Sequence, residues 1–179
     1  MSALEMKEKI AELVRRIIPE LERLSCYDDY DDVIPRPGKP ASKAQIEAYE
    51  KYLGVQLPSS YVAFLELHNG YEALAFPGKD LLSIESVMPG GENFKDIDEW
   101  KKNCAEGTHE IQDAIVISNS DQPNNWDFLD PHSPSEGGEF AVVRWTPSRS
   151  LRFANFRDYL EKWCLATCKT AYEEIRHEN

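Results

Sequence analysis

The spacing of apolar residues changes at Gly70, and this change limits the folds open to the chain. Before Gly70, apolar residues recur every three or four positions, as on one face of a helix. After it, short apolar runs at 71–76, 81–85, 114–118, 126–130 and 139–145 are bounded by Pro, Gly, Asn or Ser, which is typical of strands. A last helical stripe follows Asn155. This order predicts an α+β fold, a mainly antiparallel sheet with helices packed on one side.

Length and composition favour one domain. The chain has 179 residues, 41% of them hydrophobic, which suffices for a single core. Apolar residues between Ile10 and Leu24 predict a long N-terminal helix, with a kink or restart at Pro19. Residues 1–40 are therefore interpreted as this helix plus an acidic, Pro-rich connector, and residues 41–179 as the α+β domain, which ends in a second long helix.

Helix boundaries are unusually clear between residues 42 and 70. Ser42 and Gln45 form a capping box, and Gly54 ends the helix that they begin. Pro58 suits the first position of the next helix, which Asn69 and Gly70 end.

The segment IEAYEKYLGVQLPSSYVAFLELHNG at 46–70 resembles the signature of the SUKH superfamily, the domain of fungal cell-wall synthesis regulators and many bacterial relatives. A looser likeness extends over residues 41–164. The residues that carry the resemblance are Ile46, Glu50, Leu53, Gly54, Leu57, Pro58, Tyr61, Phe64, Leu65, Asn69 and Gly70. It implies a noncatalytic α+β domain and, in bacteria, an immunity protein that neutralises a cognate toxin, in many cases a nuclease.

The net negative charge of the chain also favours a protein partner, and one that is basic. The formal net charge of −12 disfavours binding to nucleic acid or to acidic membrane lipids, and favours a basic protein. Residues 85–139 contain thirteen acidic and only three basic residues. A cationic nuclease cleft would attract such a surface, with aromatic side chains as apolar anchors.

We therefore expect a partner-binding surface in this segment, formed by acidic residues and two tryptophans. The alternative is that these carboxylates only keep the protein in solution. The expected contact residues are Glu92, Asp96, Asp98, Glu99, Trp100, Asp121, Trp126, Asp127, Asp130, Glu136 and Glu139.

Two other functions fit parts of the sequence. Asp121, Asp127, Asp130 and His132 include residue types that bind metals or transfer protons, but Asp127 and Asp130 would point to opposite faces of a strand. Because no catalytic, phosphate-binding or metal-binding motif accompanies them, we expect no enzyme activity, metal or cofactor. An intracellular scaffold or regulator that docks other proteins is the remaining alternative. The N-terminal helix could be its docking element or could only cover the core, and we favour the second role.

Neither a secretory signal nor a membrane span is visible, and the four cysteines form no CxxC pair. These features predict a cytoplasmic protein without disulfides. The sequence specifies neither the toxin nor the oligomeric state.

Overall fold

The computed structural model describes residues 1–27, 34–75, 79–104, 109–119, 125–135, 137–146 and 148–178. The chain order of its elements is α1 (Ala3–Leu24), β1 (Arg36–Pro37), α2 (Lys43–Leu53), α3 (Ser59–Leu65), β2 (Tyr71–Ala75), β3 (Lys79–Leu81), α4 (Ile84–Val87), α5 (Phe94–Cys104), α6 (His109–Gln112), β4 (Ile115–Ser118), β5 (Trp126–Pro134), β6 (Phe140–Thr146), β7 (Arg149–Phe153), α7 (Phe156–Tyr159), the π-helical η2 (Leu160–Leu165) and α8 (Ala166–Glu178).

The strands of the described residues form one sheet in the order β1 to β7, and each pairs antiparallel with its neighbour. Antiparallel neighbours can be joined by short connections, whereas here residues 38–70, with α2 and α3, join β1 to β2, and residues 82–114, with α4 to α6, join β3 to β4. The predicted α+β class, single antiparallel sheet and long terminal helices are confirmed.

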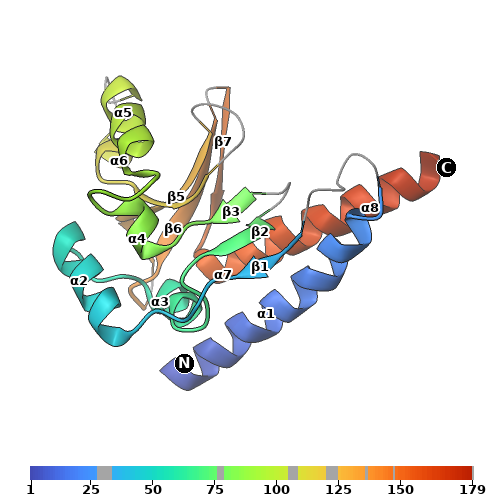
Figure 1. Ribbon diagram of the computed structural model, residues 1–179, viewed down its shortest axis with the longest axis horizontal. Helices are drawn as coiled ribbons and strands as arrows, with labels where there is room; N and C mark the ends of the chain where they lie inside the picture. Colours follow the sequence, from blue (N-terminus) through green and yellow to red (C-terminus); the bar gives the residue numbers. More distant parts are fainter. Residues whose placement is uncertain are drawn as a thin grey trace.

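Helices cover both faces of the sheet, where helices on one side were expected (Figure 1). Alternate residues of the strands point to opposite faces, so Val142 joins the core beneath α1, α3, α7 and η2. Its neighbour Val143 joins a second core beneath α5 and α6. The sheet therefore has two buried faces, and residues 94–112 form the second cover.

Local sequence signals explain most helix ends. The capping boxes Ser2–Glu5 and Ser42–Gln45 begin α1 and α2, and Gly54 ends α2 with a φ of 72°. Pro19 lies inside α1 and does not end it, because a continuous apolar stripe holds both halves of the helix against the core.

The expected strand at 81–85 is only partly correct. Leu81 ends β3, and the short helix α4 begins three residues later. The side chain of Ser83 accepts a hydrogen bond from the Ser86 amide, so a helix cap interrupts the apolar run. Among the described residues, no helix is both long and apolar enough to span a bilayer.

Candidate protein-binding surface

The two tryptophans expected as anchors lie in the second core. Trp100 of α5 is 2% exposed, and its ring centroid is 5.9 Å from that of Trp126 and 5.7 Å from that of Trp145. Trp126 is also buried. These rings hold α5 on the sheet, so we remove Trp100 and Trp126 from the expected contact surface.

Asp127 is fully buried on the opposite face of the sheet. The Tyr159 hydroxyl donates a hydrogen bond of 2.6 Å to its Oδ2 atom. Lys79 Nζ lies 3.8 Å from Oδ1, and a guanidinium nitrogen of Arg144 lies 4.0 Å from Oδ2. Burial is the main cause that raises the pKa of Tyr159 above its ordinary value. Asp127 thus joins β3, β5 and β6 to the C-terminal helices and does not face solvent.

Asp130 is also buried, and two groups satisfy its carboxylate. Arg152 donates to Oδ2 at 2.8 Å and the His132 amide donates to Oδ1 at 3.0 Å. Arg152 also contacts Glu110 at 2.9 Å, and its hydrogen bond to Asp130 is the main cause of a raised Arg152 pKa. The carboxylate therefore fixes β7 to β5.

Glu139 provides the N-terminal cap that α3 lacks. Pro58 precedes the helix and makes no side-chain cap, while Glu139 accepts hydrogen bonds from the Ser59 hydroxyl at 2.6 Å and the Ser60 amide at 3.0 Å. The Ser60 hydroxyl also donates to it. A carboxylate is favourable at a helix N-terminus, so this buried group has a structural role.

Asp127 and Asp130 point to opposite faces of the sheet. Asp127 contacts Tyr159 in the first core, whereas Trp126 and Phe128 lie in the second, and Asp130 is on their face because side chains alternate along a strand. His132 Nε2 lies 2.7 Å from Asp113 Oδ2 at the surface. No cluster of three or more metal-ligating side chains exists within the part of the chain that the structure describes.

Four expected contact residues lie together at the surface of α5 or in the turn before it: Glu92, Asp96, Asp98 and Glu99. Asp121 and Glu136 lie outside the described residues. Among the described residues, the exposed part of the expected surface therefore lies on α5 and in the turn before it.

Three lysines accompany the acidic residues of α5, but two of them are engaged. Lys102 forms an ion pair of 2.6 Å with Asp98. Lys101 donates to the Ala114 carbonyl at 2.6 Å, and burial lowers its pKa. Asp96 and Glu99 remain exposed without a protein partner among the described residues.

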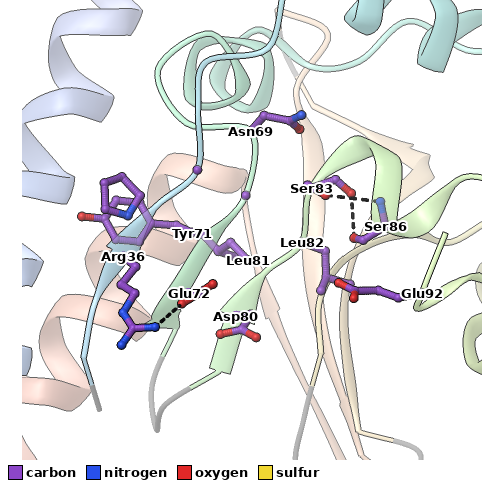
Figure 2. Close-up of a pocket in the computed structure, with 13 residues that line it drawn as sticks. Arg36, Asn69, Tyr71, Glu72, Asp80, Leu81, Leu82, Ser83, Ser86 and Glu92 are labelled. Atoms are coloured by element: carbon purple, nitrogen blue, oxygen red, sulfur yellow. Dashed lines mark hydrogen bonds and ion pairs between the residues drawn. The ribbon is translucent and has the colours of Figure 1, made fainter. Parts of the chain in front are cut away.

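A polar cleft of about 220 Å³ adjoins this helix at Glu92. Figure 2 shows it between β1, the β2–β3 pair and α4, with Glu72, Asp80 and Glu92 on its walls. Arg36 is the one cation among the described lining residues, and it lies 3.5 Å from Glu72 in an exposed pair. Carboxylates thus outnumber cations in the cleft.

The Asn69–Gly70 turn shapes this cleft. Gly70 has a φ of 86°, and a Cβ atom there would lie 2.9 Å from the Ser83 nitrogen, so only glycine fits. Asn69 accepts from the Ile84 amide at 2.8 Å and donates to Glu85 at 2.6 Å, which ties α4 to the end of α3. The sequence pattern predicted a helix end at this turn, but α3 ends four residues earlier, at Leu65. The pattern also did not indicate the carboxylates that the turn brings together.

We call Glu72, Asp80, Glu92, Asp96 and Glu99 the acidic face. Two members, Glu72 and Asp80, were not expected from the sequence, because they come from a different segment from α5 and only the paired strands β2 and β3 bring them near Glu92.

The comparisons with known proteins agree with the fold. The model of the SMI1 / KNR4 family (SUKH-1) matches residues 40–162, which include strands β2 to β7 and the second core but not α1 or α8. A search of curated proteins found no relative of this chain. Domains of this family are generally noncatalytic and act as protein-interaction modules. The chain belongs to the SMI1 / KNR4 family (SUKH-1).

Proposed function

We propose that this chain is a bacterial immunity-type protein that neutralises a cognate toxin, a basic nuclease, by binding it through the acidic face. Family membership supports a protein partner, and the net charge of −12 supports a cationic one. The observation that carries the proposal is that Glu92, which lines the carboxylate-rich cleft, lies in the turn directly before α5, whose Asp96 and Glu99 are exposed.

The cleft suits a lysine or arginine side chain of the toxin. Its volume of about 220 Å³ accepts one long side chain, and its walls offer carboxylate and serine oxygens as hydrogen-bond acceptors. The Arg36–Glu72 pair is exposed and long, so a cation that replaces it encounters little competition. A toxin held in this way would have its substrate-binding cations covered.

The genes that neighbour this one are searched first for a toxin, because immunity proteins are typically encoded beside their toxins. Association kinetics are then measured with the purified toxin over a range of salt concentrations. The test variant Asp96→Lys with Glu99→Lys is expected to slow association about tenfold or more at low salt and to flatten the salt dependence.

The control variant Glu173→Lys with Glu174→Lys changes net charge by the same amount on α8, away from α5 (Figure 1). If both variants slow association equally, net charge alone acts and the acidic face is not the site. If neither affects binding of a toxin that the protein does inhibit, the interface lies elsewhere.

The intracellular scaffold remains the second candidate, since the family also contains regulators. It predicts several endogenous partners and no toxin, and a protective effect against one toxin in co-expression would contradict it.

A further inference from the structure

A groove that shares no residue with the acidic face runs along one side of α3. Its volume of about 810 Å³ lies within the range of ligand-binding sites. Ser59, Val62, Ala63 and Glu66 line it at intervals of one to four residues that place them on one face of the helix. At 1.5 Å per residue this face is about 10 Å long, which corresponds to two helical turns.

The core of the protein lies on the opposite side of α3. Tyr61, Phe64 and Leu65 point away from the groove and are buried in the first core. The groove is therefore not a defect in the core but a surface feature beside a well-packed helix. Its remaining walls come from the α2–α3 connection and the start of β6, and their apolar members are Val55, Leu57 and Phe140.

The rim of this groove is open. Gly54, Gly137 and Gly138 border it, and a Cβ atom built on any of them would have no other atom within 4 Å. No neighbouring group is packed against these three positions, so the backbone of another molecule can approach the groove closely there.

The charged groups of the groove are acidic. Among the described lining residues they are Glu50 and Glu66. The Leu57 amide donates to Glu50 at 2.8 Å, which holds this carboxylate at the groove. Glu66 pairs with Lys7 at 3.2 Å, but both side chains are exposed and such a pair contributes little, so a cation of another molecule can replace Lys7. With the net charge of −12, these carboxylates favour a basic occupant and oppose a second copy of this chain.

We propose that this groove binds a basic amphipathic helix of a partner protein. The apolar walls require apolar side chains, and the two glutamates require lysine or arginine beside them. A helix presents its apolar side chains every three or four residues, which is the spacing of the α3 face, so the two helices can pack side by side over these two turns. This inference does not rest on the acidic face or on the proposed toxin.

Fluorescence anisotropy with a labelled peptide tests the groove in the full chain. The probe is a helical peptide of about 15 residues of leucine and lysine, with the leucines at helical spacing. We expect micromolar binding at about 0.15 M salt. Two control peptides should bind at least about tenfold more weakly: one with glutamate in place of lysine, and one with the same composition but the leucines moved off the helical spacing.

Two variants of the groove have controls that change the charge equally on α8. Val62→Lys puts a cation on the apolar wall and should weaken peptide binding about tenfold or more, whereas Thr170→Lys should not. Glu66→Gln removes one carboxylate and should weaken it about threefold, whereas Glu174→Gln should not. Circular dichroism verifies the fold of each variant, and Glu66→Gln, an exposed change, keeps the test valid if Val62→Lys does not fold.

Peptide binding that both groove variants weaken and both α8 controls preserve supports the proposal. Absence of binding to the wild type overturns it, as does equal binding of the glutamate peptide or equal weakening by the groove variants and their controls. Peptide binding that is lost in Asp96→Lys with Glu99→Lys but kept in Val62→Lys and Glu66→Gln also overturns it, because the peptide then binds the acidic face. The two proposals can therefore fail separately.

Discussion

Glu139 tests whether the buried acidic residues of this chain stabilise the fold rather than bind a partner. It caps α3 from the position directly before β6, 79 positions after Ser60, by accepting from the Ser60 amide at 3.0 Å and from two serine hydroxyls. Glu139→Ala removes the acceptor of all three donors. We expect the variant to remain folded but to unfold at lower urea concentration.

The expected loss follows from the exposure of each donor. Ser60 is fully buried, so its amide and hydroxyl each lose a charged acceptor that water cannot easily replace, at a cost of about 1–2 kcal/mol apiece. Ser59 is exposed and re-forms its bond with water. The negative charge at the helix start adds about 0.5 kcal/mol. The sum is about 3 kcal/mol, a large part of the stability of a single domain.

Urea unfolding followed by circular dichroism at pH 7 measures this change. Glu139→Gln keeps one carbonyl oxygen in place and should lose only about 1 kcal/mol. Glu66→Ala is the control at the C-terminal end of the same helix, where an exposed pair with Lys7 contributes at most about 0.5 kcal/mol. A loss below about 1 kcal/mol for Glu139→Ala would refute the assigned capping role.

Three further changes test other parts of the structure. Tyr159→Phe removes the 2.6 Å hydrogen bond to the buried Asp127 carboxylate, and urea unfolding should show a loss of about 2 kcal/mol; an unchanged midpoint would contradict the assigned role of this bond. Ala73 has a φ of 55°, so Ala73→Gly should relieve strain and raise the melting temperature by about 2 °C in calorimetry, whereas a lower value would show that the site is unstrained. Burial lowers the pKa of His68, so below about pH 6.5 the unfolded chain binds a proton that the folded chain resists, and stability falls. Urea midpoints at pH 7.5 and 5.5 should therefore differ more in the wild type than in His68→Asn, and equal differences would remove His68 as the cause.

Helix caps were predictable from the sequence because they depend on neighbouring residues. Ser42 and Gln45 bond to each other across one turn, and Asn155 accepts from the Asp158 amide three positions on. Gly54 ends α2 because glycine readily adopts the left-handed backbone conformation found there. In each case the interaction that ends or begins the helix joins residues within about four positions, so the local sequence pattern predicts it.

The position of the second layer of helices could not be predicted from the sequence. Phe94, Ile97, Trp100 and Cys104 recur at helical spacing, but such a stripe does not say which face of a sheet the helix covers. The sequence indicated the second covered face through consecutive apolar residues in the strands, which point alternately to the two faces. Val142 and Val143 are adjacent and both buried, and such continuous apolar runs indicate a sheet covered on two faces.

The carboxylates of the candidate site were misjudged where their partners are distant in sequence. Asp127 bonds to Tyr159 and Glu139 bonds to Ser60, across 32 and 79 positions. Summing charge along a segment treats every carboxylate as exposed. A buried carboxylate must be hydrogen-bonded or paired, and no short-range pattern reveals such a partner.

The difference between buried and exposed carboxylates determines which of them can attract a partner. The buried carboxylates Asp127 and Asp130 have arginine neighbours, so part of the negative charge of residues 85–139 is neutralised inside the fold. The exposed part is concentrated where Lys101 turns inward and Lys102 is paired, which leaves Asp96 and Glu99 to act on a partner. Selectivity for the proposed partner would arise from the local arrangement of charges on α5, because total charge attracts every basic protein alike. Lys95 is already an exposed cation beside Asp96, and a second cation placed there should reduce binding of the proposed partner more than the same charge placed on α8.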